Sequence, residues 1–317
     1  MVFKTLFIGM KPKNGLLLPI FTILFIIFGS AVPAQQIVLL GIAQDAGYPQ
    51  TGCTKECCTP VFRNPAQAKH SVSFALADTT QKKWWLFEAT PGITSQLAMF
   101  HEVTGGRFPV LPEGIFITHA HIGHYTGLMY LGREAMNTNA IPVYALPRMC
   151  TFLEKNGPWS QLVKLKNITL NTIQPDSNVS LSHNISVLPF TVPHRDEFSE
   201  TAGFRISMPG KRILFIPDID KWEKWNRNIV HEVNNTDIAL LDATFFSVAE
   251  LPNRNISEIP HPLVTETMQL FKNQPLHTKN KIWFIHFNHT NPVLRNTAER
   301  KRVLKNGYHI AAQKQVL

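Results

Sequence analysis

A short segment of the chain places three histidines close together. Residues 118–124 read THAHIGH, so His119, His121 and His124 fall within six residues. The segment follows an apolar run typical of a strand, so side chains two residues apart leave it on the same side, and His124 begins the next predicted helix. Neutral imidazoles are the commonest ligands of zinc and similar ions. The spacing therefore predicts that all three side chains bind metal.

Four further apolar runs end in residues of a metal-binding type. Histidine follows FTVP at His194 and WFI at His286, and aspartate follows LFIP at Asp218 and ALL at Asp242. Open α/β sheets build their sites where the carboxyl ends of several strands meet. We therefore expect these side chains to converge with the three histidines. Asp242 is interpreted either as a support for the ligands or as a structural hydrogen-bond acceptor.

The elements that position these residues are short strands alternating with helical patterns. Such a mixture, without a break in composition, predicts one layered α/β domain over residues 35–317. The predicted strands cover residues 37–42, 71–78, 84–89, 114–119, 142–146, 185–193, 203–207, 212–217, 237–243 and 281–287. The predicted helices cover residues 94–101, 125–135, 221–231, 263–271 and 293–305.

The composition and the N-terminal residues limit the classes of function that this protein can have. The 317 residues are 44% hydrophobic and carry a formal charge of +9, which falls to +6 without the three lysines of residues 1–34. No dense basic run supports nucleic-acid binding, whereas a small, anionic substrate is compatible with the charge. Residues 1–34 are predicted to be a signal peptide, because lysines precede a short apolar run that ends in the small residues AVPA. We expect a periplasmic or secreted protein without a stable membrane span, or a membrane-anchored one if the signal is not cleaved.

The cysteines leave two interpretations open. Cys53, Cys57 and Cys58 form a cluster, and Cys150 stands apart as an inert small residue. An oxidising compartment favours disulfides. However, adjacent cysteines rarely bridge each other, and one disulfide would leave an odd thiol in the cluster. Three thiolates with one more ligand would instead bind zinc.

The segment THAHIGHYTGL resembles the H-x-H-x-D-H loop of the metallo-β-lactamase superfamily, and the resemblance extends from Gln36 to the end of the chain. It implies a four-layer αββα sandwich with a site for one or two ions of Zn²⁺, or of Mn²⁺ or Fe²⁺, at the seam between the sheets. His194 matches the position of the third histidine, Asp218 that of the bridging carboxylate and His286 that of the last histidine. Three flanking segments are similar to those of the coenzyme PQQ synthesis protein B family: GIAQDAGYPQTGC, LLDATFF and IHFNHTNP.

The cysteine-rich loop is also similar to that of the cyclic phosphodiesterases of phosphonate breakdown. That family holds a structural zinc through cysteines of this loop and a histidine three residues after its last catalytic histidine. The resemblance implies that Cys53, Cys57, Cys58 and His289 bind a structural zinc ion, with a disulfide as the alternative.

One position departs from the family pattern, because Gly123 stands where the superfamily has an aspartate that ligates the second metal ion. The second site keeps His124, Asp218 and His286, and we expect it to be weaker, empty or completed by another carboxylate. Asp196 and Glu197 follow His194 and are candidates, although a surface or supporting role is the preferred interpretation.

The leading hypothesis is a metallo-hydrolase that uses a metal-activated water on an ester- or phosphodiester-type substrate. Asp218 would orient the water or act as its base, Arg195 would hold a substrate anion or pair with a neighbouring acid, and His261 would line the pocket or simply begin a helix. A non-hydrolytic role like that of the PQQ synthesis protein B family, on a quinone cofactor precursor, is the alternative. A metal-binding protein without turnover is the third possibility.

Overall fold

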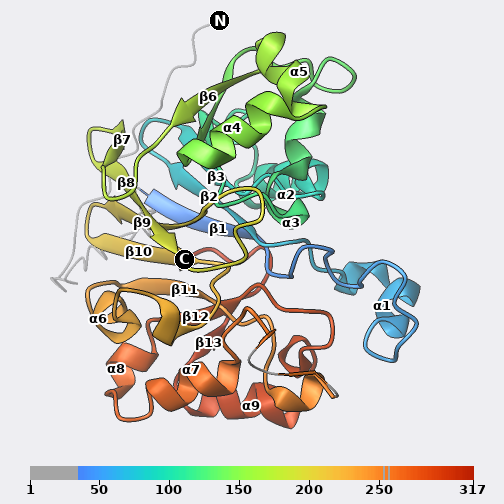
Figure 1. The fold of residues 1–317 in the computed structure, drawn as a ribbon, viewed down its shortest axis with the longest axis vertical. Coiled ribbons are helices and arrows are strands. Elements are labelled where there is room, and N and C mark those ends of the chain that lie inside the picture. Colours follow the sequence, from blue (N-terminus) through green and yellow to red (C-terminus); the bar gives the residue numbers. More distant parts are fainter. Residues whose placement is uncertain (1–34, 253, 256–257) are drawn as a thin grey trace, which may run out of the picture. The chain divides into compact units, whose positions relative to one another are not determined.

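Two mixed β-sheets form the centre of the fold (Figure 1). The structure is a computed structural model that describes residues 35–252, 254–255 and 258–317. The predicted signal peptide at residues 1–34 therefore lies outside the described residues. The first sheet contains, in spatial order, β1 (Gln35–Gly41), β2 (Ser73–Asp78), β3 (Lys83–Phe87), β4 (Gly114–Phe116), β5 (Ile141–Ala145) and β6 (Ile168–Thr172).

The second sheet runs in the order β13 to β7. Its strands are β7 (Val179–Ser182), β8 (Ile185–Val192), β9 (Thr201–Met208), β10 (Lys211–Ile216), β11 (Ile238–Asp242), β12 (Ile282–Ile285) and β13 (His309–Ile310). β10 to β13 pair in parallel, as do β3 to β6 in the first sheet. The carboxyl ends of several strands therefore lie at the same edge of each sheet.

Alternation of side chains along the first sheet creates two separate apolar layers. In β1, Ile37 and Leu39 face the second sheet, whereas Val38 and Leu40 face the helices. Phe74 of β2 meets Phe215 of β10 across the inner layer, with ring centroids 4.9 Å apart at 81°. Such edge-to-face contacts favour close packing of aromatic cores. β1 to β4 are buried on both faces along nearly all of their length, which explains their nearly continuous apolar sequences.

Helices cover the outer face of each sheet (Figure 1). Those beside the first sheet are α2 (Ile93–Val103), α3 (Ile122–Tyr125), α4 (Pro147–Lys155) and α5 (Trp159–Lys164). Those beside the second are α6 (Ile229–Asn234), α7 (Val264–Leu270), α8 (Leu276–Lys279) and α9 (Ala298–Lys305), and α1 (Thr59–Arg63) lies apart on the loop after β1. This arrangement confirms the predicted αββα sandwich. Among the described residues, no helix is both long and apolar enough to cross a membrane.

Three predicted helices differ from the structure. The segment predicted as a helix over 125–135 is the end of α3 followed by a 3₁₀ turn at Thr126–Leu131. Gly127 lies against the backbone of the segment after β3 there, because a Cβ at this position would come within 2.1 Å of the Thr90 carbonyl oxygen. The helices predicted over 221–231 and 293–305 begin later, as α6 and α9, after cap residues Asn228 and Thr297 whose side chains accept a backbone hydrogen bond.

Candidate metal centre

All six predicted ligands converge at the carboxyl ends of the strands. His119, His121 and His124 follow β4 in the first sheet, and the other three follow strands of the second sheet. These are His194 after β8, Asp218 after β10 and His286 after β12. The ligating atoms of His119, His121 and His194 lie within 4.8 Å of one another, as do those of His119, His124 and Asp218.

Asp218 occupies the middle of the cluster and faces histidines on both sides. Its Oδ2 lies 3.0 Å from Nε2 of His124 and 3.1 Å from Nε2 of His286. Its Oδ1 lies 3.6 Å from Nε2 of His194 and 3.5 Å from Nδ1 of His261. A carboxylate with one oxygen toward each group of imidazoles has the geometry of a bridging ligand.

Several buried polar atoms of the cluster have no hydrogen-bond partner among the described residues. They include Nε2 of His124, His194 and His286 and Oδ2 of Asp218, whose close approaches lack hydrogen-bond geometry. Buried polar atoms without partners are costly, and native structures rarely leave them so. Imidazole nitrogens and a carboxylate oxygen that share one small space form the donor set of a divalent cation such as zinc. The residues present therefore fit a metal centre.

Neighbouring side chains contact the Nδ1 atom of three of the histidines. Nδ1 of His119 lies 2.9 Å from Oγ1 of Thr118, and Nδ1 of His286 lies 2.9 Å from Oγ1 of Thr244. Nδ1 of His124 lies 3.3 Å from Oε1 of Glu88, whose carboxylate is fully buried. Contacts of this kind fix the orientation of metal-binding imidazoles and leave the opposite nitrogen toward the ion.

The charges of the cluster oppose the effects of burial. Burial alone would raise the pKa of Asp218, but the adjacent His286 and His124 hold it well below its usual range. Burial would lower the pKa of His124, but Glu88 and Asp218 raise it well above its usual value. Burial dominates at His194 and lowers its pKa to about 4. An ionised Asp218 beside a neutral His194 suits metal binding, because both present lone pairs.

His261 lies at the edge of the cluster and is held by Asp242. Its Nδ1 is 2.8 Å from Oδ2 of Asp242 and 3.1 Å from Oγ1 of Thr244. Burial would lower the pKa of His261, but Asp242 outweighs it and raises the pKa. The structure thus places His261 in the site, and Asp242 supports its ring. His261 therefore lies beside Asp218 with its ring held by a carboxylate.

The loop after His194 contributes less than the sequence suggested. The side chain of Arg195 is about half exposed and forms an ion pair with Glu197, 3.7 Å between Nη1 and Oε1. Asp196 turns to Thr201, whose hydroxyl donates to Oδ1. Oε2 of Glu197 lies 3.2 Å from Nε2 of His121. Neither Asp196 nor Glu197 is among the groups that surround His124 and His286.

Two carboxylates of the site were missed by the sequence reasoning. Glu88 follows β3, and Asp45 lies four residues beyond the end of β1. Oδ1 of Asp45 lies 3.4 Å from Nε2 of His124, and these two residues form a metal-compatible group with His286. Glu88 could have been found from the same strand-end pattern that marked the other ligands. Asp45 carried a weaker signal, because loop residues intervene.

The cysteine cluster is assembled as expected, with His289 as its fourth member. Sγ of Cys57 lies 3.9 Å from Sγ of both Cys53 and Cys58, and all three thiols are free. The ligating atoms of the three cysteines and His289 lie within 4.8 Å of one another. Two sulfur ligands about 2.3 Å from a tetrahedral zinc ion are separated by roughly 3.8 Å. The spacing is therefore that of a zinc site rather than of a disulfide.

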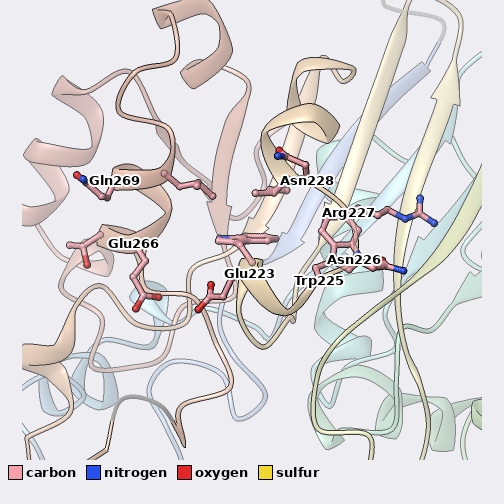
Figure 2. Close-up of a pocket in the computed structure, with 11 residues that line it drawn as sticks. Glu223, Trp225, Asn226, Arg227, Asn228, Glu266 and Gln269 are labelled. Atoms are coloured by element: carbon pink, nitrogen blue, oxygen red, sulfur yellow. The ribbon is translucent and has the colours of Figure 1, made fainter.

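A separate surface hollow of about 820 Å³ lies between the segment after β10 and α7 (Figure 2). Its lining includes Trp222, Trp225 and Arg227 on one side and Glu266 and Gln269 on the other. None of its lining residues belongs to the histidine and carboxylate cluster. We therefore assign the candidate active site to the cluster and not to this hollow.

The fold and this site define a protein of the metallo-β-lactamase type. A β-lactamase superfamily domain model matches residues 83–287, which is more than half of the chain. The chain therefore belongs to the β-lactamase superfamily.

Within this superfamily the chain is similar to proteins named coenzyme PQQ synthesis protein B. The relative from Rhizobium meliloti (strain 1021) is 24% identical over 302 residues, covering 87% of this chain and 95% of the relative. The relative from Acinetobacter baylyi is 25% identical over 297 residues, covering 85% and 94%.

Solved structures show the same fold. A Zn²⁺-bound PqqB from Methylobacterium extorquens superimposes with a TM-score of 0.72 at 20% identity, covering 89% of this chain and 99% of that one. A diphosphatase from the PhnP family superimposes with a TM-score of 0.64 at 18% identity, covering 89% and 96%. These similarities confirm the resemblance to the PQQ synthesis protein B and phosphonate-breakdown branches.

Proposed function

We propose that this protein is a metal-dependent hydrolase that acts on a small, anionic ester or phosphodiester. One observation carries the proposal: buried imidazole nitrogens and an Asp218 oxygen converge on one space without hydrogen-bond partners among the described residues. The structural neighbour named a diphosphatase of the PhnP family supports hydrolysis in this fold. β-Lactam, thioester and lactone substrates remain to be compared in the same test.

The ligands divide into two sets around the bridging Asp218. His119, His121 and His194 would hold one divalent cation, and His124 and His286 would hold a second. A bound divalent cation, zinc or alternatively manganese or iron, would lower the pKa of its water to about 7 and polarise the scissile group. The low pKa of Asp218 keeps its carboxylate ionised, which suits a bridging ligand better than a general base.

His261 is the residue that we assign to proton transfer. Asp242 raises its pKa above the usual value, which favours the protonated form of His261, and this form can donate its proton to the leaving oxygen of the substrate. In its protonated form His261 also offers a positive charge to an anionic substrate. Arg195 lies exposed on the loop after His194, where it can meet a substrate only by leaving Glu197.

A non-hydrolytic role in handling a quinone precursor is the second candidate. It is favoured by the PQQ synthesis protein B relatives, which match over 85–87% of this chain. The two candidates differ in turnover: a hydrolase cleaves an ester at a rate set by its metal content. A protein of the second kind would bind metal and cleave none of the esters.

Two further assignments complete the proposal. We propose a structural zinc ion held by Cys53, Cys57, Cys58 and His289, separate from the catalytic ions. We also propose that residues 1–34 direct export to the periplasm or the exterior. Cell fractionation with an N-terminal sequence of the mature chain tests the export, and a mature chain that begins at Met1 in the cytoplasm contradicts it.

The deciding experiment combines metal analysis with a substrate panel. The purified protein is assayed against a phosphodiester, a thioester, a lactone and a β-lactam before and after chelation. We expect phosphodiester or ester cleavage that chelation abolishes and added metal restores. His194→Ala should remove it, while His183→Ala, at an exposed turn, should not. Bound metal without turnover on any of these substrates would favour the second candidate.

A further inference from the structure

The space beside Gly123 is filled by another residue of the site. A Cβ at position 123 would lie 2.4 Å from both Cα and Oδ1 of Asp45 and 3.0 Å from its Cβ. Real Cβ atoms do not make contacts this short, so a side chain at position 123 is incompatible with the present position of Asp45. The φ angle of Gly123 is not in the left-handed region that favours glycine. Space, rather than backbone conformation, therefore accounts for glycine here.

Asp45 turns its carboxylate to the second group of ligands. Oδ1 accepts a hydrogen bond from the Gly123 N–H at 3.2 Å and lies 3.4 Å from Nε2 of His124. It belongs with His124 and His286 to a group whose ligating atoms lie within 4.8 Å of one another. Nε2 of both histidines is buried without a hydrogen-bond partner among the described residues. The carboxylate and the two imidazoles thus face a common position.

The backbone holds Asp45 firmly at this place. Ala43 pairs in parallel with both Ser71 and Phe287, so the segment before Asp45 runs beside the residue that follows His286. The Ser71 hydroxyl also donates to the carbonyl oxygen of Asp45 at 2.7 Å. The side chain of Asp45 remains 23% exposed, which leaves the position open to solvent and to an ion.

We propose that Asp45 ligates the second metal ion and replaces the aspartate that the superfamily loop carries at the position of Gly123. The ligand has moved from the loop after β4 to the loop after β1, and glycine at position 123 provides the room for it. The second site then consists of Asp45, His124, His286 and the bridging Asp218, and its number of carboxylates is undiminished. Gly123 alone led us to expect weak binding of the second metal ion. With Asp45 as a ligand, we expect both metal ions to be bound well.

This proposal rests on the metal binding of the proposed function, and manganese is the probe that separates the two. Mn²⁺ favours carboxylate and imidazole ligands over thiolates, so the cysteine cluster does not enter the count. The chelated full-length protein is titrated with Mn²⁺, and free and spin-coupled Mn²⁺ are followed by electron paramagnetic resonance. We expect two ions per native chain and a spin-coupled signal.

Two variants test Asp45 from opposite directions. Asp45→Ala removes the carboxylate, and Gly123→Ala leaves it in the chain but displaces it. Each should lower the affinity for the second Mn²⁺ ion by on the order of tenfold or more and abolish the spin-coupled signal, while the first ion stays bound. Asp196→Asn is the matched control, because its carboxylate binds Thr201 and should leave both ions unchanged. Circular dichroism confirms that each metal-free variant is folded.

The outcomes are distinct. Two ions held equally well by the native protein and by Asp45→Ala would overturn the role of Asp45, as would loss of the second ion in Asp196→Asn alone. A native chain that binds one ion, unaffected by Asp45→Ala, would overturn it as well. A native chain that binds neither Mn²⁺ nor Zn²⁺ at the histidines would instead contradict the proposed function.

Discussion

Replacing Asp242 by asparagine tests how His261 is held in its protonated form. Oδ1 of Asp242 accepts from the N–H and the hydroxyl of Thr244, at 2.9 and 2.7 Å. Oδ2 accepts from the N–H of Ile219 at 3.2 Å and faces Nδ1 of His261 at 2.8 Å. Asparagine offers a single oxygen, and its amide nitrogen would face donors on whichever side it lies. The substitution therefore keeps the volume but leaves a buried donor unpaired.

The expected loss of stability has two parts. An unpaired buried donor costs about 1–3 kcal/mol at any pH. The second part depends on pH, because Asp242 raises the pKa of His261 and burial lowers it in the variant. The stabilisation from the raised pKa is fully present below a pH of about 6.5 and is lost as the pH rises through the pKa of folded His261. The deficit should therefore exceed about 1–3 kcal/mol in acid, where both parts act, and fall to about 1–3 kcal/mol once folded His261 has lost its proton.

Urea unfolding of the chelated native protein and of Asp242→Asn, at pH 5.5 and 8.5, measures both parts. The native-to-variant difference should be larger at pH 5.5, and the NMR titration of His261 should move to lower pH. Asp237→Asn is the control, since the carboxylate of Asp237 accepts a hydrogen bond from the exposed backbone N–H of Arg212. A deficit that is equal at both pH values, or larger at pH 8.5, would refute the assigned pairing of Asp242 with His261.

Three further changes are expected to separate the metal sites. His119→Ala should remove most of the metal and the activity and leave a folded domain, because the two sheets supply the core; metal analysis and circular dichroism measure this. Cys58→Ser should release about one zinc ion. Native zinc affinity at that cluster should rise between pH 6 and 8, because burial raises the pKa of the Cys58 thiol to about 12 and binding must displace its proton. Glu88→Gln should lower the pKa of His124 and lower the affinity for the second ion about 10–100-fold, measured by manganese titration.

Each of these changes has a control and a contradicting result. His183→Ala should keep its metal, and unchanged metal content in His119→Ala would contradict the ligand assignment. Cys150→Ser should release no zinc. If the cluster forms a disulfide, thiol counting under denaturation would find two blocked thiols and His289→Ala would change nothing. Unaltered manganese affinity in Glu88→Gln would show that the ring of His124 is held without Glu88.

Local sequence patterns predicted ten of the strands and the convergence of the polar side chains that follow them, whereas β6, β7 and β13 were not predicted. The run ending at His119 predicted a strand over 114–119, and β4 covers Gly114–Phe116. The run ending at Asp218 predicted 212–217, and β10 covers Lys211–Ile216. These segments are buried on both faces, so their apolar character is continuous and easily read. A polar residue directly after such a strand must lie at the edge of the sheet, because the buried strand before it fixes its position.

Features that depend on contacts distant in sequence were not predicted. α4 and α5 were not predicted, because each is short, with nine and six residues, and has few buried residues from which a helical period could be read. Asp45 was missed because its role depends on the space beside Gly123, which only the folded chain brings to it. Glycine at position 123 looked like the loss of a ligand in the sequence, whereas in the structure the carboxylate of Asp45, 78 positions earlier, lies against Gly123 and beside His124.

The ligands of the candidate centre come from both sheets, and this has a consequence for the order of events during folding. The first sheet, complete by Thr172, carries three histidines after β4, and the second sheet carries His194, Asp218 and His286. Neither half of the chain holds a full set of ligands. On the proposed function, tight capture of a cation would therefore wait until the second half has been synthesised and its sheet has docked on the first. A bound cation would then indicate that the two sheets have docked correctly.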